Sequence, residues 1–235
     1  MCLRQRAPYG SVSKRMATEF TALIPVNRLD RAKGRLSELL GADERARLAL
    51  ATLRTVLEAV RAAGGHAVVL TGDDAVAANL DEGAELLLED SAVSGLNPQL
   101  EYALEAMGHD EVLVLHADLP LASAEALERI VRGAPPPPSA TIVRSPDGGT
   151  NAMFLRPPGS FPLRYGRDSA ALHRQAAFAA GVTFSRRTEP ALALDLDTPE
   201  DVAALFKSEQ GRDSRAGRLL AELGVRARLH QSAGR

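Results

Sequence analysis

The fold of this chain is decided by the stretch Val112-Leu113-Val114-Leu115-His116-Ala117-Asp118-Leu119-Pro120-Leu121. Its four consecutive apolar residues predict a strand that is buried on both faces, and the run then stops at a carboxylate and a proline. In an open parallel sheet, ligands bind beyond the carboxyl ends of the strands. An unpaired buried carboxylate is costly, so Asp118 needs a partner, and a divalent metal ion is one candidate. The plainer interpretation is that Asp118 caps the turn that follows.

Strands and helices are expected to alternate on both sides of this stretch. Before it, we expect strands over 20–26, 66–73 and 84–90, with a helix over 43–63, a short helix, and a helix ending near residue 107. After it, we expect helices over 123–132, 169–180 and from 198, and extended segments over 141–143, 150–155 and 192–197. Such alternation predicts right-handed crossovers and an α/β fold with a mostly parallel sheet.

The composition of the chain limits the classes of protein to which it could belong. The chain has 235 residues, 45% of them hydrophobic, which is enough for one sizeable core. A net charge of −2 gives no reason to expect a nucleic-acid partner. No apolar run approaches the ~20 residues that span a bilayer, so no membrane is expected. The lone cysteine is compatible with a cytoplasmic protein. We expect a disordered extension over 1–18, one domain over 19–210 and a helical tail over 211–235.

Two further aspartates, Asp195 and Asp197, stand in the predicted strand over 192–197. Residues two apart on a strand point to one face, so these carboxylates would project together and repel unless a cation lies between them. Mg²⁺ suits such a pair, since it takes carboxylate and phosphate oxygens. The plainer interpretation, that Asp197 helps to start the next helix, leaves Asp195 unexplained.

A basic segment follows the first predicted strand. Arg28, Arg31, Lys33 and Arg35 place four cations within eight residues, where the phosphates of a nucleotide lie in sheet proteins. A solvated basic loop is the alternative, but the position after the first strand favours phosphate binding.

A third candidate site combines Thr150 with the turn Gly166 to Ser169. Ser169 begins a predicted helix, where free N–H groups and the helix dipole favour an anion, and Gly166 permits close backbone approach. An ordinary helix cap is the alternative. His173, one turn later, shares the helix face of Ser169 and is expected to be structural or to support the site.

In their order along the chain these motifs resemble the 2-phospho-L-lactate guanylyltransferase family, which includes the bacterial phosphoenolpyruvate guanylyltransferases. The resemblance covers about residues 21–205. It rests on short motifs, namely Ala32-Lys33-Gly34-Arg35-Leu36, Gly95-Leu96-Asn97, Ala117-Asp118-Leu119-Pro120, Gly149-Thr150-Asn151, Tyr165-Gly166 with Ser169 and His173, and Asp195-Leu196-Asp197-Thr198-Pro199-Glu200-Asp201. It implies a single-domain Rossmann-like fold of the nucleotide-diphospho-sugar transferase type, with a mostly parallel mixed sheet and helices on both faces.

The resemblance also implies roles. Asp118, Asp195 and Asp197 would hold Mg²⁺, and Lys33 and Arg28 would meet the triphosphate of GTP, with Lys33 and Asp118 as catalytic residues. Gly95, Leu96 and Asn97 would meet the nucleoside, and Thr150, Gly166 and Ser169 the carboxylate of a small phosphorylated acid. The implied reaction transfers GMP from GTP to phosphoenolpyruvate or 2-phospho-L-lactate, in the biosynthesis of coenzyme F-420, and releases pyrophosphate.

Two other functions stay open from the residues. One is a molybdopterin or sugar-phosphate nucleotidyltransferase, although such enzymes often carry a glycine-rich loop where this chain has only Gly34. The other is a non-catalytic nucleotide-binding regulator, against which the three aspartates argue. A homodimer is also expected, with apolar residues of the 150–165 segment contributing: Met153, Phe154, Leu155, Phe161 and Leu163.

Overall fold

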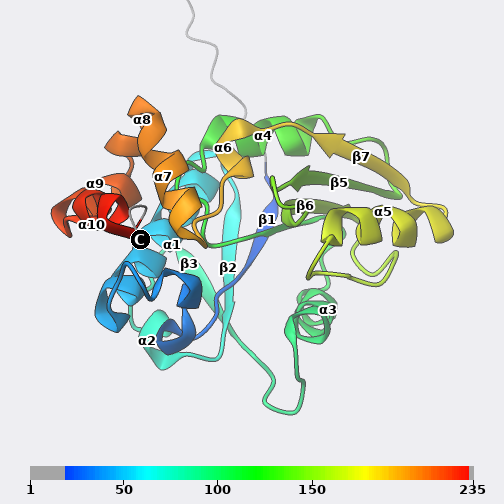
Figure 1. Ribbon diagram of the computed structural model, residues 1–235. Helices are drawn as coiled ribbons and strands as arrows, with labels where there is room; N and C mark the ends of the chain where they lie inside the picture. Colours follow the sequence, from blue (N-terminus) through cyan, green and yellow to red (C-terminus); the bar gives the residue numbers. More distant parts are fainter. Residues whose placement is uncertain (1–18, 233–235) are drawn as a thin grey trace, which may run out of the picture.

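The computed structural model describes residues 19–232, and a seven-stranded sheet lies at its centre (Figure 1). The strands lie side by side in the order β3-β2-β1-β4-β6-β5-β7. Their bounds are β1 Thr21–Pro25, β2 His66–Thr71, β3 Ala84–Leu88, β4 Val112–Leu115, β5 Ser139–Arg144, β6 Thr150–Arg156 and β7 Thr183–Arg187. The predicted mostly parallel, mixed sheet is therefore confirmed.

Among the strands of the described sheet, β6 alone runs antiparallel to its neighbours. It pairs antiparallel with both β4 and β5, while β1 pairs parallel with β2 and β4, β2 with β3, and β5 with β7. The amino end of β6 consequently lies at the same edge as the carboxyl end of β4, since Leu115 pairs with Ala152. Residues at the start of β6 thus reach the edge where ligands are expected.

Helices cover both faces of the sheet, as predicted. Alternate residues of a strand face opposite sides, so Ala22 and Ile24 of β1 join one core cluster while Leu23 joins the other. The first cluster contains α1 (Ala42–Ala62) and α4 (Ala124–Arg132). The second contains α3 (Leu96–Met107) and α5 (Ser169–Ala179), which lie on the other side in Figure 1.

The C-terminal helices form a third cluster with the segment after β1. Leu36, in the short 3-10 helix η2 (Gly34–Leu36) after η1 (Leu29–Arg31), packs in one cluster with Leu205 and Leu220. The helices involved are α7 (Pro199–Lys207), α9 (Arg215–Glu222) and α10 (Val225–Ser232), with α8 (Glu209–Asp213) between α7 and α9. The predicted boundary at residue 210 stays a prediction, and the predicted disorder of 1–18 falls outside the described residues.

The predicted strand over 192–197 is wrong. Pro190 begins a single helical turn, α6 (Pro190–Ala193), because its fixed φ suits the first turn of a helix. The chain then runs extended from Leu194, and the backbone N–H of Leu196 donates to the carbonyl of Asp118 at 3.2 Å. The alternation of leucine with polar residues over 192–197 fits an extended segment outside the sheet as well as it fits a strand, so the sequence did not distinguish the two.

Two other expectations also change. Strand β7 was not predicted, since Thr183-Phe184-Ser185-Arg186-Arg187 is a largely polar edge strand without strict alternation. The apolar residues after Thr150 that were expected at a dimer interface close the core instead: Met153, Phe154, Leu155, Phe161 and Leu163 are all at most 5% exposed. Their apolar character therefore gives no support to a dimer. Among the described helices, none is long and apolar enough to cross a membrane.

Candidate active site

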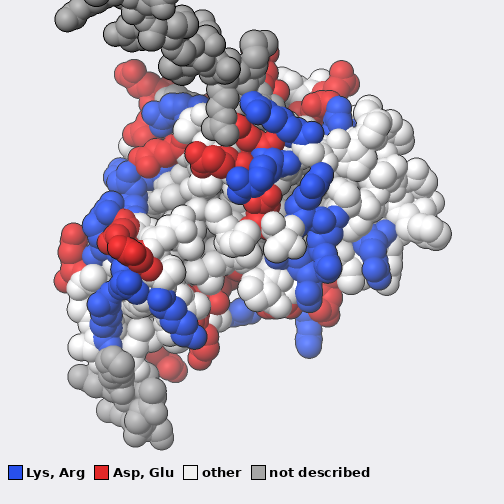
Figure 2. Space-filling model, turned by 90° about the horizontal axis from the view of Figure 1, so that it is seen from above, with Lys and Arg blue, Asp and Glu red and all other residues white. Residues whose placement is uncertain are grey.

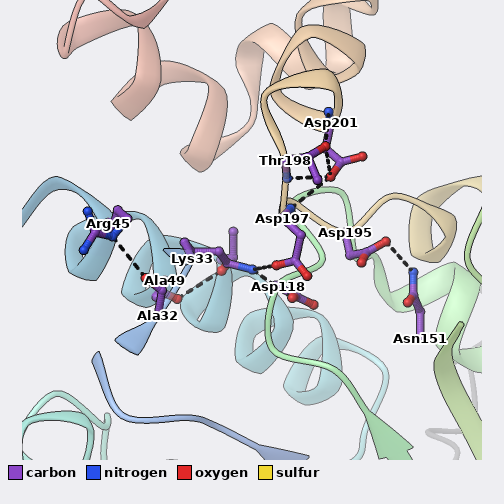
Figure 3. Close-up of polar contacts among 11 residues, drawn as sticks. Ala32, Lys33, Arg45, Ala49, Asp118, Asn151, Asp195, Asp197, Thr198 and Asp201 are labelled. Carbon is purple, nitrogen blue, oxygen red and sulfur yellow. Dashed lines mark hydrogen bonds and ion pairs between the residues drawn. The ribbon is translucent and has the colours of Figure 1, made fainter. Parts of the chain in front are cut away.

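Three aspartates from separate parts of the sequence meet at the edge of the sheet. Asp118 follows β4, while Asp195 and Asp197 stand in the extended segment between α6 and α7 (Figure 3). One carboxylate oxygen from each lies within 4.8 Å of those of the other two. The backbone bond from Leu196 to Asp118 holds the two segments side by side. The predicted grouping of these aspartates is thus found, although no strand carries Asp195 and Asp197.

The start of α7 fixes the position of Asp197. Thr198 is the N-cap, its hydroxyl accepts the N–H of Asp201, and Pro199 occupies the first turn. The Asp201 carboxylate in turn accepts the N–H groups of Asp197 at 3.1 Å and Thr198 at 2.8 Å. This reciprocal capping box satisfies helix-end donors and locks the backbone next to the carboxylate of Asp197.

Lys33 lies between two of these carboxylates. Its Nζ donates to Asp118 Oδ2 at 2.8 Å and to Asp197 Oδ1 at 3.0 Å, and its side chain is only 6% exposed. Its backbone is left-handed, with φ 53°, a conformation that residues with a side chain seldom adopt. Strained backbone of this kind persists where the surroundings hold it, and it clusters at functional sites.

The burial and the charges of this cluster shift the pKa values of its own side chains. Burial works to lower the pKa of Lys33, but Asp118 and Asp197 outweigh it and the pKa lies above its usual value. Burial works to raise the pKa of Asp118, yet the Lys33 ammonium brings it below the usual value. No cation among the described residues pairs with Asp195 in this way, and burial together with the charge of Asp118 raises its pKa to about 6.

The donor set fits a divalent cation. Three carboxylates against one ammonium leave excess negative charge, and all the ligand atoms are the hard oxygens that Mg²⁺ prefers. Asp118 Oδ1 is buried and finds no hydrogen-bond partner among residues 19–232. A buried carboxylate oxygen without a donor is costly, and a metal ion would satisfy it.

Beside the aspartates lies a neutral, buried network. Ser169 Oγ donates to Thr150 Oγ1 at 3.0 Å, and Thr150 Oγ1 also contacts His173 Nδ1 at 3.2 Å. All three residues are at most 2% exposed. Thr150 and Ser169 are thus brought together as expected, with His173 buried behind them.

The N-terminus of α5 offers fewer free donors than the sequence suggested. The N–H groups of Ser169, Ala170 and Ala171 are bonded to the carbonyls of Gly166, Gly148 and Asp168 respectively. The Ser169 hydroxyl is engaged by Thr150. Gly166 is exposed, with φ 133°, a conformation that favours glycine.

Two asparagines tie the segments of the site together. Asn151 donates to the carbonyls of Leu192 and Ala193 and, at 3.4 Å, to Asp195 (Figure 3). Asn97, in the first turn of α3, exchanges two hydrogen bonds with the backbone of Tyr165, at 2.7 and 3.0 Å. Gly95 is the N-cap of that helix, with φ 96°. In this structure Asn97 therefore holds the loop that leads to Gly166.

Arg28 stands apart from the cluster. Its guanidinium pairs with Asp30 at 3.3 Å, and both side chains are more than half exposed. Basic and acidic side chains lie interspersed on the face seen in Figure 2, and neither sign covers it alone. A broad basic surface of the kind that binds nucleic acid is not seen on this face.

Three buried side-chain atoms in the described part of the chain lack a hydrogen-bond partner: His116 Nε2, Asp118 Oδ1 and Tyr165 Oη. The rings of His116 and Tyr165 are 5.5 Å apart, and that of Tyr165 is 4.8 Å from His173. Burial lowers the pKa of His116 and raises that of Tyr165. Orphaned buried polar atoms are rare and call for an explanation. His116 and Tyr165 stand inside motifs quoted from the sequence, but the sequence assigned them no role, because neither pattern nor spacing reveals a missing hydrogen-bond partner.

Comparison with known proteins decides the family. The family described as "Guanylyl transferase CofC like" matches residues 20–235. The phosphoenolpyruvate guanylyltransferase of Rubrobacter xylanophilus is 40% identical over 80% of this chain and 93% of its own. This chain belongs to the CofC-like guanylyltransferases. The 2-phospho-L-lactate guanylyltransferase of Methanocaldococcus fervens is 30% identical, over 91% of this chain and 96% of its own.

Solved structures confirm the fold of this guanylyltransferase. A protein of Desulfovibrio desulfuricans described as a candidate nucleotide-diphospho-sugar transferase superposes with a TM-score of 0.73 at 19% identity, covering 90% of this chain and 96% of its own. A nucleotidyl transferase from Methanothermobacter gives a TM-score of 0.59, with 79% and 95% covered. The fold expected from the resemblance is therefore present.

Proposed function

We propose that this chain transfers GMP from GTP to the phosphate of phosphoenolpyruvate or 2-phospho-L-lactate and releases pyrophosphate, as a step in coenzyme F-420 biosynthesis. With phosphoenolpyruvate the product is enolpyruvoyl-2-diphospho-5'-guanosine. The observation that carries the proposal is the cluster of Asp118, Asp195 and Asp197 around Lys33, at the sheet edge where this fold binds nucleotides. The names of the relatives support the choice of substrates.

The chemistry needs no side-chain base. An oxygen of the acceptor phosphate attacks the α-phosphorus of GTP, and the bond to the bridging oxygen breaks as pyrophosphate leaves. A phosphate monoester is already largely ionised at neutral pH, with a second pKa of about 6. The work left to the protein is to position two anions and to neutralise their charge.

The aspartates and Lys33 divide that work. Asp118, Asp195 and Asp197 would hold Mg²⁺, which supplies Lewis-acid neutralisation of phosphate charge. Lys33 is held ready by two carboxylates, and we propose that its ammonium turns to the triphosphate when the nucleotide binds. Arg28, exposed at the end of the same loop, would add a second cation to the phosphates.

The acceptor and the nucleoside are assigned to the other side of the site. Thr150, Gly166 and Ser169 would form the subsite for the acceptor carboxylate, with Ser169 acting through its hydrogen bond to Thr150. The orphaned Tyr165 Oη and His116 Nε2 nearby support a polar ligand there. Gly95 would lie against the nucleoside. The contacts of Asn97 with Tyr165 favour a role in joining the nucleoside side to the acceptor side. A cytoplasmic homodimer completes the proposal and rests on composition and on family resemblance alone.

An acceptor panel tests the function. The protein is incubated with GTP, Mg²⁺ and one acid at a time, namely phosphoenolpyruvate, 2-phospho-L-lactate, 3-phosphoglycerate or a sugar phosphate. Pyrophosphate release and the product mass are measured. We expect release with the first or second acid only. Release with a sugar phosphate alone would indicate the alternative transferase, and GTP binding without release a regulator. Asp197→Asn, which removes a cluster charge, should abolish release.

A further inference from the structure

The hydroxyl oxygen of Thr150 makes two hydrogen bonds, one with Ser169 and one with His173, and the tautomer of His173 sets the direction of the second. The backbone N–H of Arg164 donates to His173 Nε2 at 2.9 Å, so that nitrogen carries no proton. A buried ring that must accept at Nε2 is neutral and carries its proton on Nδ1. Burial also lowers the pKa of His173 to about 4, in agreement with a neutral ring.

This tautomer of His173 sets the direction of its bond to Thr150. With its proton on Nδ1, His173 donates to Thr150 Oγ1, 3.2 Å away. Ser169 Oγ donates to the same oxygen at 3.0 Å. Both lone pairs of the Thr150 oxygen are therefore used, and neither neighbour can accept its proton. Within residues 19–232 no other acceptor contacts this hydroxyl.

We infer that His173 is a positioning residue that makes the Thr150 hydroxyl an obligate hydrogen-bond donor to the anionic group of the acceptor. The inference rests on the proposed function for the identity of the acceptor. Carboxylate and phosphate oxygens only accept hydrogen bonds, so a hydroxyl that is forced to donate is matched to them. Thr150 is 2% exposed, and a charge-assisted hydrogen bond formed there is poorly screened by water.

The surroundings of His173 agree with this role. Its ring lies 4.8 Å from Tyr165 and 6.4 Å from Phe161, both edge-on, which fixes its plane. Tyr165 Oη and His116 Nε2, the orphaned atoms named above, belong to the same aromatic group. Thr150, Tyr165 and His116 are thus linked through these ring contacts and the bond to His173, and each keeps hydrogen-bonding capacity that the described residues leave unused.

Kinetics of matched variants test the inference. His173→Leu should raise the KM for the acceptor about tenfold, the loss of roughly one hydrogen bond, with the KM for GTP little changed. His173→Asn, whose amide can still donate to Thr150, should recover most of the loss. In a Thr150→Val background His173→Leu should have no further effect, since no hydroxyl remains to orient. His109→Leu, at an exposed histidine, is the control.

Two outcomes would overturn the inference. The first is an equal rise in acceptor KM from His173→Leu with and without the Thr150 hydroxyl, which would make His173 a packing residue only. The second is a ¹⁵N NMR spectrum of the wild-type protein that places the His173 proton on Nε2. The spectrum needs neither substrate nor variant, so it decides the tautomer even if His173→Leu fails to fold. If no acid in the panel accepts GMP while the spectrum shows Nδ1–H, the proposed function has failed and the hydrogen-bond polarity stands.

Discussion

The two halves of the candidate site are built on opposite principles. The half around Lys33 holds three carboxylates and one ammonium, and its geometry is a balance of charges. The half around Thr150 holds no ion pair among its hydroxyls and imidazole, and its geometry is set by hydrogen-bond direction. Charges attract over several ångströms and tolerate small shifts, whereas a hydrogen bond requires a distance and an angle.

The difference indicates how each half should respond to change. In the charged half, removing one carboxylate alters the field that every other group feels, so a single substitution is expected to be severe. In the neutral half, removing the Thr150 hydroxyl deletes its directional contacts with Ser169 and His173 but leaves no charge without its partner.

The largest loss of transfer activity is expected from Asp118→Asn. The substitution keeps the shape of the side chain but removes a charge that holds Lys33 and is proposed to hold Mg²⁺. Transfer should fall by at least about a hundredfold, the scale of losing a metal-site group, while the melting temperature changes little. Pyrophosphate release at saturating substrates measures it, with Asp81→Asn, 56% exposed, as the control. Near-normal activity at limiting Mg²⁺ would refute the assignment of Asp118.

A smaller and selective effect is expected from Thr150→Val and Lys33→Ala. Thr150→Val should raise the KM for the acceptor about tenfold and leave that for GTP nearly unchanged, since one hydrogen bond to a charged group is lost. Lys33→Ala should do the reverse. Initial rates over a grid of both substrate concentrations separate the two constants. If each variant weakened the other substrate, the two halves would be exchanged.

Thr198→Ala probes the support of the charged half. The capping hydroxyl of α7 is lost, which should lower the free energy of unfolding by about 1 kcal/mol. Because the same cap fixes the backbone of Asp197, half-maximal activity should require a higher concentration of Mg²⁺. Chemical denaturation and a Mg²⁺ titration of activity report the two effects. Ser208→Ala, which removes the cap of α8, should cost similar stability and leave the Mg²⁺ requirement unaltered.

The smallest effect is expected at an ion pair outside both halves. Arg228 of α10 and the Gly41 N–H hold the pKa of Glu44 down to about 2. A lowered acid pKa adds stability above its ordinary value near 4.5, and that stability is lost as the pH falls through about 2. Glu44→Gln should thus destabilise the protein by at most about 1 kcal/mol at pH 7. Denaturation midpoints at pH 7, 4 and 2.5 should converge with wild type as the pH falls. A difference that does not depend on pH would exclude the charge as its cause.

Sequence alone predicted the charged half better than the neutral half, for a physical reason. Three aspartates and a lysine in or after predicted strands are conspicuous in a sequence, because a buried ion needs a partner whatever the details of packing. The bonds of His173, by contrast, depend on where the N–H of Arg164 points, which no pattern of residue types encodes. The strand expected over 192–197 failed for a similar reason, since a strand needs a neighbour as well as an alternating sequence.

One feature of the sheet links the halves. At the amino end of β6, Thr150 contacts Ser169 and His173, while the next residue, Asn151, contacts Asp195. Consecutive residues of a strand face opposite sides and their Cα atoms are about 3.8 Å apart. A single peptide unit thus sets the distance between Thr150, which is proposed to bind the carboxylate of the acceptor, and the aspartate cluster, which is proposed to act on its phosphate. The site should therefore select acceptor acids by the distance between their carboxylate and phosphate groups. A residue inserted after Thr150 should abolish that selectivity even if both halves of the site stay intact.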